Sequence, residues 1–426
     1  MEILNSEKKR RIAIVTIMLV SALYLLIQGV RYVPRTSYGF AAYYGYARLL
    51  LNERDFSKTY DYEYFNNRLR SYGLGEDLPN NIPTNAFALL PISWLSAKSA
   101  RVCFISVSIG LFCLSIFLLF RLLGIPPQTD IFFSLLAVIF FFHPVTANIA
   151  LGQLYFILLF LFIVSLYGIT KKSVWLVAVP IALSLLLKGY GVVPLIWLAW
   201  TKRWKEFFLT VTLVAIVVVA TLPLIGLETW IIYYEKVVRT LGRLPADGHV
   251  AYQCINGFVT HLFVYDQQWH PFPLFALSER TVFPIGVSLS LLIIFFVVSN
   301  GQANDHQAAM SFSAAVAAGV VTAPLVEEYH FVLFLPLVIS LFSSVFRENK
   351  KPLTLGSLEL VTIVGLLLLT LPLPYKSLQF SRAPLILLAY PRLYGGMLIL
   401  FGYVSYQKKS RLNELAPSIL IGENTH

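Results

Sequence analysis

The sequence predicts an all-α fold, a polytopic membrane helix bundle that takes in the whole chain as one domain, residues 1–426. The first observation is composition: 57% of the residues are hydrophobic and 13% are charged, whereas about 25% of a soluble domain is charged. The second is that apolar runs recur along the chain, each roughly as long as a helix needs to cross a bilayer. The clearest runs are residues 12–30, 102–120, 207–227, 282–298 and 385–406.

Basic residues at the ends of the apolar runs determine the topology, because placing them all in the cytoplasm satisfies the positive-inside rule. These basic residues lie at 8–11, 121, 171–172, 202–205, 347–351 and 408–411. The segment 174–200 must then turn back at Lys188-Gly189-Tyr190-Gly191, since one long helix would put the cluster at 202–205 outside. The sequence therefore predicts about twelve membrane segments, with both termini cytoplasmic, in a multi-pass protein of the plasma membrane.

Two long segments then lie outside the membrane, residues 31–100 and 228–280. In the first external segment, residues 41–51 have helical spacing with aromatic side chains on one side, which predicts a helix lying in the membrane interface. Residues 83–95 form a second apolar stretch that is too short to span the bilayer. The second external segment is rich in aromatic residues and proline, which is typical of a cleft at the membrane surface.

Polar and ionisable residues gather on this external side, where they cost free energy next to apolar spans unless they have a function. They are Asp61, Glu63, His143, Gln153, Lys188, Asn256, Glu327, Glu328 and His330. The turn that contains Glu327, Glu328 and His330 joins two spans and could position a sugar, a phosphate or a proton. Lys188 follows three leucines, and a lysine at this depth suits the phosphate of a lipid.

Each of these residues also has a purely structural explanation. The turn at 327–330 could simply be solvated, and Lys188 could extend to ordinary lipid head groups. Gln153 either binds sugar hydroxyls or links two helices by a hydrogen bond. Asn256 fits a turn, and His143 fits a helix cap. Three cysteines without regular spacing predict neither a disulfide framework nor a metal site.

In the first external segment, Asp61 and Glu63 lie among tyrosines, a setting suited to stacking against a sugar. Either carboxylate, or Asp55 nearby, could act as a general base, although no spacing rule selects one of them. The net charge of +11 could suggest nucleic acid, but the basic residues lie at the ends of spans. We therefore expect no nucleic-acid partner.

A series of short motifs lies between Tyr38 and Pro336. The motifs are Gly39-Phe-Ala-Ala-Tyr-Tyr with a later Tyr60-Asp61, Asn81-Ile-Pro83-Thr, Leu90-Pro91, Gly152-Gln153, Lys188, Asn256, and Ala323-Pro324 through His330. In this order they resemble the GT-C membrane glycosyltransferases, and within them the polyprenol-phosphate-mannose-dependent family 87. That family has Asp-Phe before a tyrosine-rich helix, then Tyr-Asp, Pro-Pro, Leu-Pro, Gly-Gln-x-Asn, Lys-Pro, Asn-Gln-Ser and a Ser-Pro-x-Ser-Trp-x-His turn.

The sequence departs from this pattern at four positions. The family's catalytic Asp falls on Gly39, and the Asn after Gly-Gln is Tyr155. The Pro after the Lys is Gly189, and the Gln-Ser after the Asn is Gly257-Phe258. Either another acid of the first external segment replaces the missing base, or the chemistry differs, as in a catalytically inactive member.

The resemblance implies an integral membrane hexosyltransferase that moves a mannose-like sugar from a polyprenyl-phosphate donor to a lipid or glycan acceptor at the external face. The expected catalytic residues are Asp61, Glu63, Asp55 and His330, and the expected substrate-binding residues are Lys188, Gln153, Glu327, Glu328, Arg31, Arg35 and Asn256. Lys188, with Arg31 or Arg35, would neutralise the leaving phosphate, so no cofactor is required, although the carboxylates leave room for a divalent cation. Membrane lipids are the other expected partner.

Two other classes of function could use the same residues. In a transporter or lipid flippase they would line a translocation path, which predicts polar residues through the bilayer depth and an internal repeat. In a non-catalytic membrane scaffold, Lys188 and the turn at 327–330 would have no purpose. The cytoplasmic halves of the spans are almost uniformly apolar, which favours the enzyme.

Overall fold

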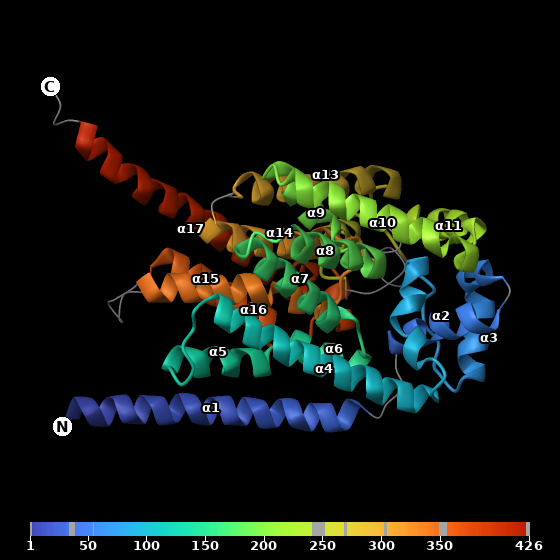
Figure 1. Ribbon diagram of the computed structural model, residues 1–426, viewed down its shortest axis with the longest axis horizontal. Coiled ribbons are helices and arrows are strands. Elements are labelled where there is room, and N and C mark those ends of the chain that lie inside the picture. The colour runs from blue at the N-terminus through green and yellow to red at the C-terminus, as the bar shows by residue number, and fades with distance from the viewer. Residues whose placement is uncertain are drawn as a thin grey trace.

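The computed structural model of this protein describes residues 2–33, 39–53, 55–240, 252–267, 271–301, 305–348 and 356–422. Within these ranges the chain is helical and has no strand, only two isolated β-bridges. The long helices lie side by side in a bundle (Figure 1). The predicted all-α class is therefore confirmed.

The helices follow one another in chain order, and η marks short 3₁₀ helices, with η4 a π-helix. The first half contains α1 (Glu2–Tyr32), α2 (Phe40–Asn52), η1 (Phe56–Tyr60), α3 (Tyr62–Ser71), η2 (Pro83–Ala88), η3 (Leu90–Ile92), α4 (Ala97–Leu122), α5 (Asp130–Phe141), α6 (His143–Leu151), α7 (Tyr155–Thr170), α8 (Val174–Lys188) and α9 (Val192–Trp200). The second half contains α10 (Trp204–Ile225), α11 (Leu227–Tyr233), η4 (Tyr234–Val238), α12 (Ile255–Phe263), α13 (Glu279–Ser299), α14 (Asp305–Thr322), η6 (Glu328–Phe334), α15 (Leu335–Glu348), α16 (Ser357–Thr370), η7 (Leu378–Ser381), η8 (Leu385–Ala389) and α17 (Pro391–Gly422).

Among the described residues, five helices are long and apolar enough to cross a membrane. They are Glu7–Tyr32 within α1, α4, α10, α13, and Glu328–Val345, which joins η6 to α15. A sixth span forms if α5 and α6, which meet at a bend of 44°, are counted together, and α7, α8, α14 and α16 are shorter apolar helices. The chain is thus a membrane protein with several spans, and the number of about twelve segments stays a prediction.

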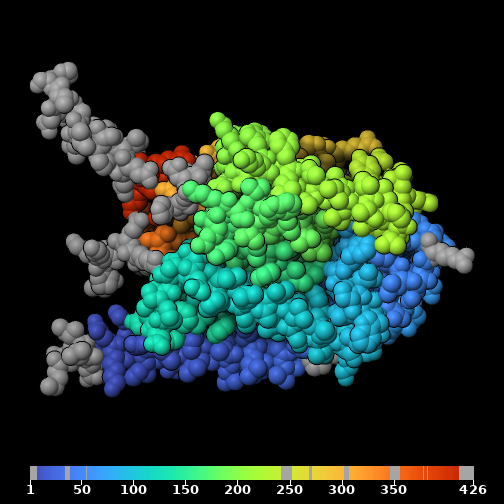
Figure 2. Space-filling view, in the orientation of Figure 1, coloured from blue at the N-terminus to red at the C-terminus, as the bar shows by residue number. Residues whose placement is uncertain are grey.

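The spans differ in how much of their surface the protein itself covers. In the most apolar stretch of 18 residues in α1, only 6% of the residues are buried inside the protein. The share is 11% in α10 and 83% in Glu328–Val345. Figure 2 shows α1 and α10 on the outside of the molecule. Lipid tails would cover these apolar faces in a bilayer. The segment made by η6 and α15 therefore lies at the centre of the bundle.

The two predicted external segments meet at one end of the bundle. In Figure 1, α2, α3 and α11 lie at the end opposite to the start of α1 and the end of α17. The rings of Tyr60 and Tyr233 are 5.6 Å apart, and Lys236 donates a hydrogen bond of 3.4 Å to the Tyr60 carbonyl. The first external segment therefore packs against the second, and we call this the loop end of the bundle.

The predicted break after Lys188 is present. α8 ends at Lys188, and Gly189 takes a left-handed conformation with φ +74° that stops the helix. Gly191 then lies against Ile181 and Leu185 of the helix that has just ended. The chain therefore turns back along α8, in agreement with the predicted hairpin.

Two predictions from the sequence are wrong. Residues 385–406 do not form one span, because η8 ends at Ala389 and α17 begins at Pro391, which has no N–H with which to continue a helix. Residues 41–51 do form a helix, but α2 does not lie on the surface. Nine of its 13 residues are buried, because α3, α4 and η2 pack around it.

Candidate active site

A cavity of about 1000 Å³ lies at the loop end of the bundle. Its walls come from α2, the loop after α3, α6, the end of α8, and the turn between α14 and η6. Six of the residues that the sequence predicted line it, namely His143, Gln153, Lys188, Glu327, Glu328 and His330. The fold therefore brings most of the predicted polar set into one partly open cavity.

The first external segment holds the end of the helix that carries Lys188. Thr84 Oγ1 donates a hydrogen bond of 2.6 Å to the Leu186 carbonyl, and Asn85 Nδ2 donates one of 2.8 Å to the Leu187 carbonyl. Carbonyls in the last turn of a helix have no partner within the helix itself. Both side chains come from η2, so this short element caps α8 and fixes the position of Lys188.

The ammonium group of Lys188 faces the cavity beside an aromatic ring. Its Nζ lies 5.0 Å from the centre of the Tyr43 ring, which is a cation–π geometry. Among the described residues, no carboxylate oxygen lies within 4.0 Å of this Nζ. A largely enclosed ammonium without an ion-pair partner favours an anion that enters the cavity.

Gln153 closes another side of the cavity and links two helices. Gly152 ends α6 in the left-handed conformation, with φ +61°, and Gln153 follows it into the cavity wall. The Tyr43 hydroxyl donates a short hydrogen bond to Gln153 Oε1. This bond ties α2 to α6, so the helix-linking role predicted for Gln153 is present.

Asp77 also lines the cavity, although the sequence did not single it out. Its Oδ2 accepts hydrogen bonds from the N–H groups of Gly39, at 2.6 Å, and Ala42, at 3.1 Å. Its Oδ1 accepts one of 2.8 Å from the N–H of Leu78. Burial raises the pKa of the Asp77 carboxyl, while these N–H groups and the charge of Lys188 act in the opposite direction. A carboxylate from the loop after α3 thus caps the start of α2.

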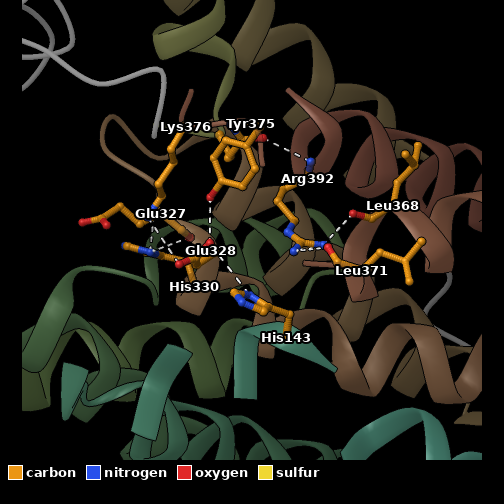
Figure 3. Close-up of polar contacts among 10 residues, drawn as sticks. His143, Glu327, Glu328, His330, Leu368, Leu371, Tyr375, Lys376 and Arg392 are labelled. Atoms are coloured by element: carbon orange, nitrogen blue, oxygen red, sulfur yellow. Dashed lines mark hydrogen bonds and ion pairs between the residues drawn. The ribbon is translucent and has the colours of Figure 1, made fainter. Parts of the chain in front are cut away.

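Glu328 belongs to a group of polar side chains that Figure 3 shows together. Its Oε2 accepts a hydrogen bond of 2.9 Å from the Tyr375 hydroxyl, and its Oε1 accepts one of 3.3 Å from Lys376 Nζ. His143 Nδ1 lies 3.8 Å from Oε2. Tyr375 and Lys376 come from the segment after α16, where no motif signalled them. The charge of Glu328 is therefore balanced from within the protein.

His330 braces the turn on which Glu327 stands. His330 Nδ1 lies 3.0 Å from both the main-chain nitrogen and the carbonyl oxygen of Glu327, so it bonds the main chain of Glu327 in either neutral tautomer. The imidazole ring centre lies 4.3 Å from that of Tyr155 and 4.4 Å from that of Tyr329. The Tyr329 hydroxyl donates a hydrogen bond of 3.1 Å to Glu327 Oε1. The turn is thus held rigidly rather than solvated.

The second external segment supports the same turn from behind. The N–H of Gln253 donates a hydrogen bond of 2.6 Å to the Val326 carbonyl, and Gln253 Nε2 donates one of 2.8 Å to the Ala389 carbonyl. Gln253 Oε1 in turn accepts from the N–H of Arg392 at 3.1 Å. Three parts of the chain that are far apart in sequence therefore meet at Gln253.

The three acids that the sequence proposed as general bases lie outside the cavity lining. Asp55 caps η1, where its Oδ1 accepts a hydrogen bond of 3.1 Å from the N–H of Ser57. Asp61 caps α3, where its Oδ1 accepts one of 2.8 Å from the N–H of Tyr64. Glu63 is exposed in the first turn of α3. The geometry gives no support to a catalytic role for any of them.

Two expected substrate-binding residues, Arg31 and Asn256, are also not among those that line the cavity. Arg31 is exposed near the end of α1. Asn256 is buried in α12, and its side chain lies against Gly286 of α13. Arg35 lies outside the described residues.

The same cavity contains several acids and imidazoles, but they are not grouped as metal ligands. Among the residues that the structure describes, no three or more His, Cys, Asp or Glu side chains are placed to hold a metal ion. A metal requirement therefore stays a question for experiment.

A sequence model of glycosyltransferase family 87 matches residues 82–327, which is more than half of the chain. The matched region includes the Thr84–Asn85 cap, Gln153 and Lys188, and it ends at Glu327. No curated protein and no solved structure gives a significant match.

Proposed function

Because the chain belongs to glycosyltransferase family 87, we propose that it transfers a mannose-like hexose from a polyprenyl-phosphate donor to a hydroxyl group of a lipid or glycan acceptor. The observation that carries this proposal is the Lys188 ammonium, which faces a cavity of about 1000 Å³ with no described carboxylate within 4.0 Å. A lipid phosphate supplies the missing anion. Its negative charge grows as the bond to the sugar breaks, so a fixed cation stabilises the transition state more than the ground state.

The remaining lining suits the other parts of such a donor. Aromatic rings of Tyr43, Tyr155 and Tyr190 provide flat walls for a sugar. Apolar residues form another part of the lining and would contact the first units of the polyprenyl chain; they include Ala147, Ala150, Leu151, Val192, Val193 and Ile294. Polar groups for sugar hydroxyls come from Gln153 and Glu327.

In the proposed reaction, the acceptor oxygen attacks the anomeric carbon on the face opposite to the phosphate, which inverts the configuration. The bond from the anomeric carbon to the phosphate oxygen breaks, and its electron pair leaves with the phosphate held by Lys188. The acceptor proton passes to a carboxylate of the cavity. Charge neutralisation by Lys188 makes a cofactor unnecessary, so we expect transfer to continue when divalent cations are chelated.

The distribution of basic residues supports an external site. Lys8–Arg11 lie at the start of the first span, and 408–411 lie within α17. The start of α1 and the end of α17 lie at the end of the bundle opposite to α2, α3 and α11 (Figure 1). The positive-inside rule puts that end in the cytoplasm, which leaves the loop end and its cavity facing outward at the plasma membrane.

The experiment is a transfer assay with purified protein in proteoliposomes. The donor is a polyprenyl-phosphate mannose with radiolabelled mannose, and the acceptor is a lipid extract of the membranes in which the protein is made. We expect label in a new product, and we expect Lys188→Ala to lower donor affinity by about tenfold or more, since a charge-assisted hydrogen bond contributes about 1.5–3 kcal/mol. Lys236→Ala is the matched control, because Lys236 is outside the cavity lining and donates to the Tyr60 carbonyl.

Two outcomes contradict the proposal in different ways. Full activity of Lys188→Ala would show that this cavity does not bind the donor phosphate. Passage of intact labelled donor across the bilayer, without transfer of its sugar, would favour the transporter or flippase hypothesis instead.

A further inference from the structure

Four acids line the cavity, and they differ in what already neutralises them. Glu76 is exposed at its mouth and forms an ion pair with Arg70. Glu328 is paired with Lys376 at 3.3 Å. A carboxylate can act as a general base only if it reaches the substrate and is not committed to a cation. The two acids that remain are Asp77 and Glu327.

Asp77 and Glu327 differ in where they stand. Glu327 lies in the turn between α14 and η6, where its Oε1 already accepts from the Tyr329 hydroxyl. Asp77 lies in the first external segment, and its neighbours Glu76 and Leu78 are both exposed. Asp77 therefore lies in a surface loop, whereas the side chain of Glu327 is already bonded within its own turn.

The Asp77 carboxylate is held in place by main-chain groups alone. The N–H groups of Gly39 and Ala42 bind Oδ2, and that of Leu78 binds Oδ1. Each carboxylate oxygen has two lone-pair directions, so both directions of Oδ2 are in use and one direction of Oδ1 stays open to a further donor. Among the described residues, no Lys, Arg or His nitrogen lies within 4.0 Å of either oxygen. The group is positioned, ionisable and not paired with a cation.

The same contact explains the residue at position 39. Gly39 stands where the resemblance to family 87 expects an acid, and the carboxylate of Asp77 lies 2.6 Å from its N–H. The loop after α3 therefore places the carboxylate of Asp77 beside position 39, where the acidic side chain that the resemblance expects is absent. Lys188 and Asp77 line the same cavity, so a cation and a carboxylate face the same substrate.

We propose that Asp77 is the general base of the transfer reaction, an inference that rests on the proposed function. The acceptor hydroxyl gives its proton to a carboxylate oxygen of Asp77 as its own oxygen bonds to the anomeric carbon. The bond from that carbon to the donor phosphate breaks at the same time, and the electron pair goes to the phosphate. Water removes the proton from Asp77 before the next turnover.

The test compares Asp77→Asn with wild type in the proteoliposome assay, using the same labelled polyprenyl-phosphate mannose and lipid extract. Asn keeps an oxygen that can accept from Gly39 and Ala42, so α2 stays capped while the base is lost. We expect the rate at saturating donor to fall at least about 100-fold with donor affinity unchanged. The wild-type rate should rise with pH through one ionisation that Asp77→Asn lacks. A merely structural cap would not produce this split between rate and affinity.

Two further variants sharpen the comparison. Asp61→Asn is the matched control, because Asp61 caps α3 in the same way outside the cavity lining, and we expect it to transfer like wild type. Asp77→Ser retains a capping oxygen without any carboxylate, so it should repeat the loss seen in Asp77→Asn.

The outcomes separate this inference from the function on which it rests. If wild type transfers sugar and Asp77→Asn does so at a similar rate, Asp77 is not the base, and the proposed function stands. Loss in Asp61→Asn but not in Asp77→Asn would assign the base to Asp61. If both Asp77 variants unfold, Asp77 is a structural cap and the inference is overturned. If wild type transfers sugar from no polyprenyl-phosphate donor, the proposed function itself fails.

Discussion

The side chain of Gln153 fills the space beside Gly39 in which any other residue at position 39 would place its Cβ. Gly39 also has φ +81°, a backbone region that L-residues rarely adopt. The Leu151 carbonyl lies 3.1 Å from the same point. The position in which Gln153 accepts its hydrogen bond from Tyr43 therefore requires that residue 39 has no Cβ.

Gly39→Ala should destabilise the protein by about 1–3 kcal/mol, because it adds both backbone strain and overlap with Gln153. Gly73→Ala is the matched control, since Gly73 has φ +73° but nothing within 4 Å of an added Cβ. Unfolding in detergent by heat or denaturant measures the difference. The double variant Gly39→Ala with Gln153→Ala should recover the part due to overlap. Equal costs for Gly39→Ala and Gly73→Ala would show that Gln153 does not restrict position 39.

Thr84→Val should weaken donor binding without touching the donor. The substitution leaves the Leu186 carbonyl, which Thr84 caps at 2.6 Å, without its partner, at a cost of about 1–3 kcal/mol. The end of α8 then loosens, and Lys188 with it. Thr170→Val is the control, because Thr170 donates to the Tyr167 carbonyl at 2.8 Å at an exposed helix end. Donor affinity is measured with labelled polyprenyl phosphate. If Thr84→Val and Thr170→Val bind it equally well, the Thr84 cap is not what holds Lys188 in position.

The helical class and six polar residues of the cavity lining could be predicted from local patterns. Lys188-Gly189-Tyr190-Gly191 signals a break, since glycine accepts the left-handed conformation that ends α8. Lys188 and Gln153 were expected to come together because topology puts the ends of their spans on one side of the membrane. Their proximity follows from the topology and needs no knowledge of tertiary contacts.

The residues that the sequence missed depend on contacts between distant segments. Asp77 caps the helix that starts at Phe40, and from the sequence it looks like any other acid of its loop. Lys376 reaches Glu328 from beyond α16. The burial of α2 has the same origin: its aromatic spacing fits the membrane interface equally well, and only packing by α3, α4 and η2 decides between them.

The rate of transfer should depend on pH through Asp77, and stability should depend on it in the opposite sense. Burial raises the pKa of the Asp77 carboxyl above its value in the unfolded chain, so the folded protein binds that proton more tightly. Its contribution to stability is complete below the unfolded pKa and is lost as pH rises through the folded pKa. A base works only when deprotonated, so transfer should rise over that same interval.

Asp77→Asn is the check on both curves. It should flatten the acidic limb of the pH–rate profile and remove this component of the pH–stability profile. If the acidic limb of the pH–rate profile lies at the same pH in Asp77→Asn as in wild type, another group, such as Glu327, sets the pH dependence of transfer.

Arg101 should prove essential for the shape of the cavity although it does not line it. The side chain is fully buried and donates hydrogen bonds to the carbonyls of Val33 at 3.2 Å, Tyr32 at 3.3 Å and Ala150 at 2.8 Å. It therefore ties the end of α1 to the end of α6, and Tyr32 and Ala150 both line the cavity.

Arg101→Lys should lower the free energy of unfolding by about 1–3 kcal/mol and weaken donor binding, because a single ammonium cannot serve carbonyls that the guanidinium fork reaches together. Arg121→Lys, an exposed arginine in the last turn of the same helix, is the control and should change neither property. If Arg101→Lys and Arg121→Lys have the same free energy of unfolding and the same donor affinity, other contacts hold the three carbonyls. A loss of affinity in Arg101→Lys without a loss of stability would instead place Arg101 in direct contact with the donor.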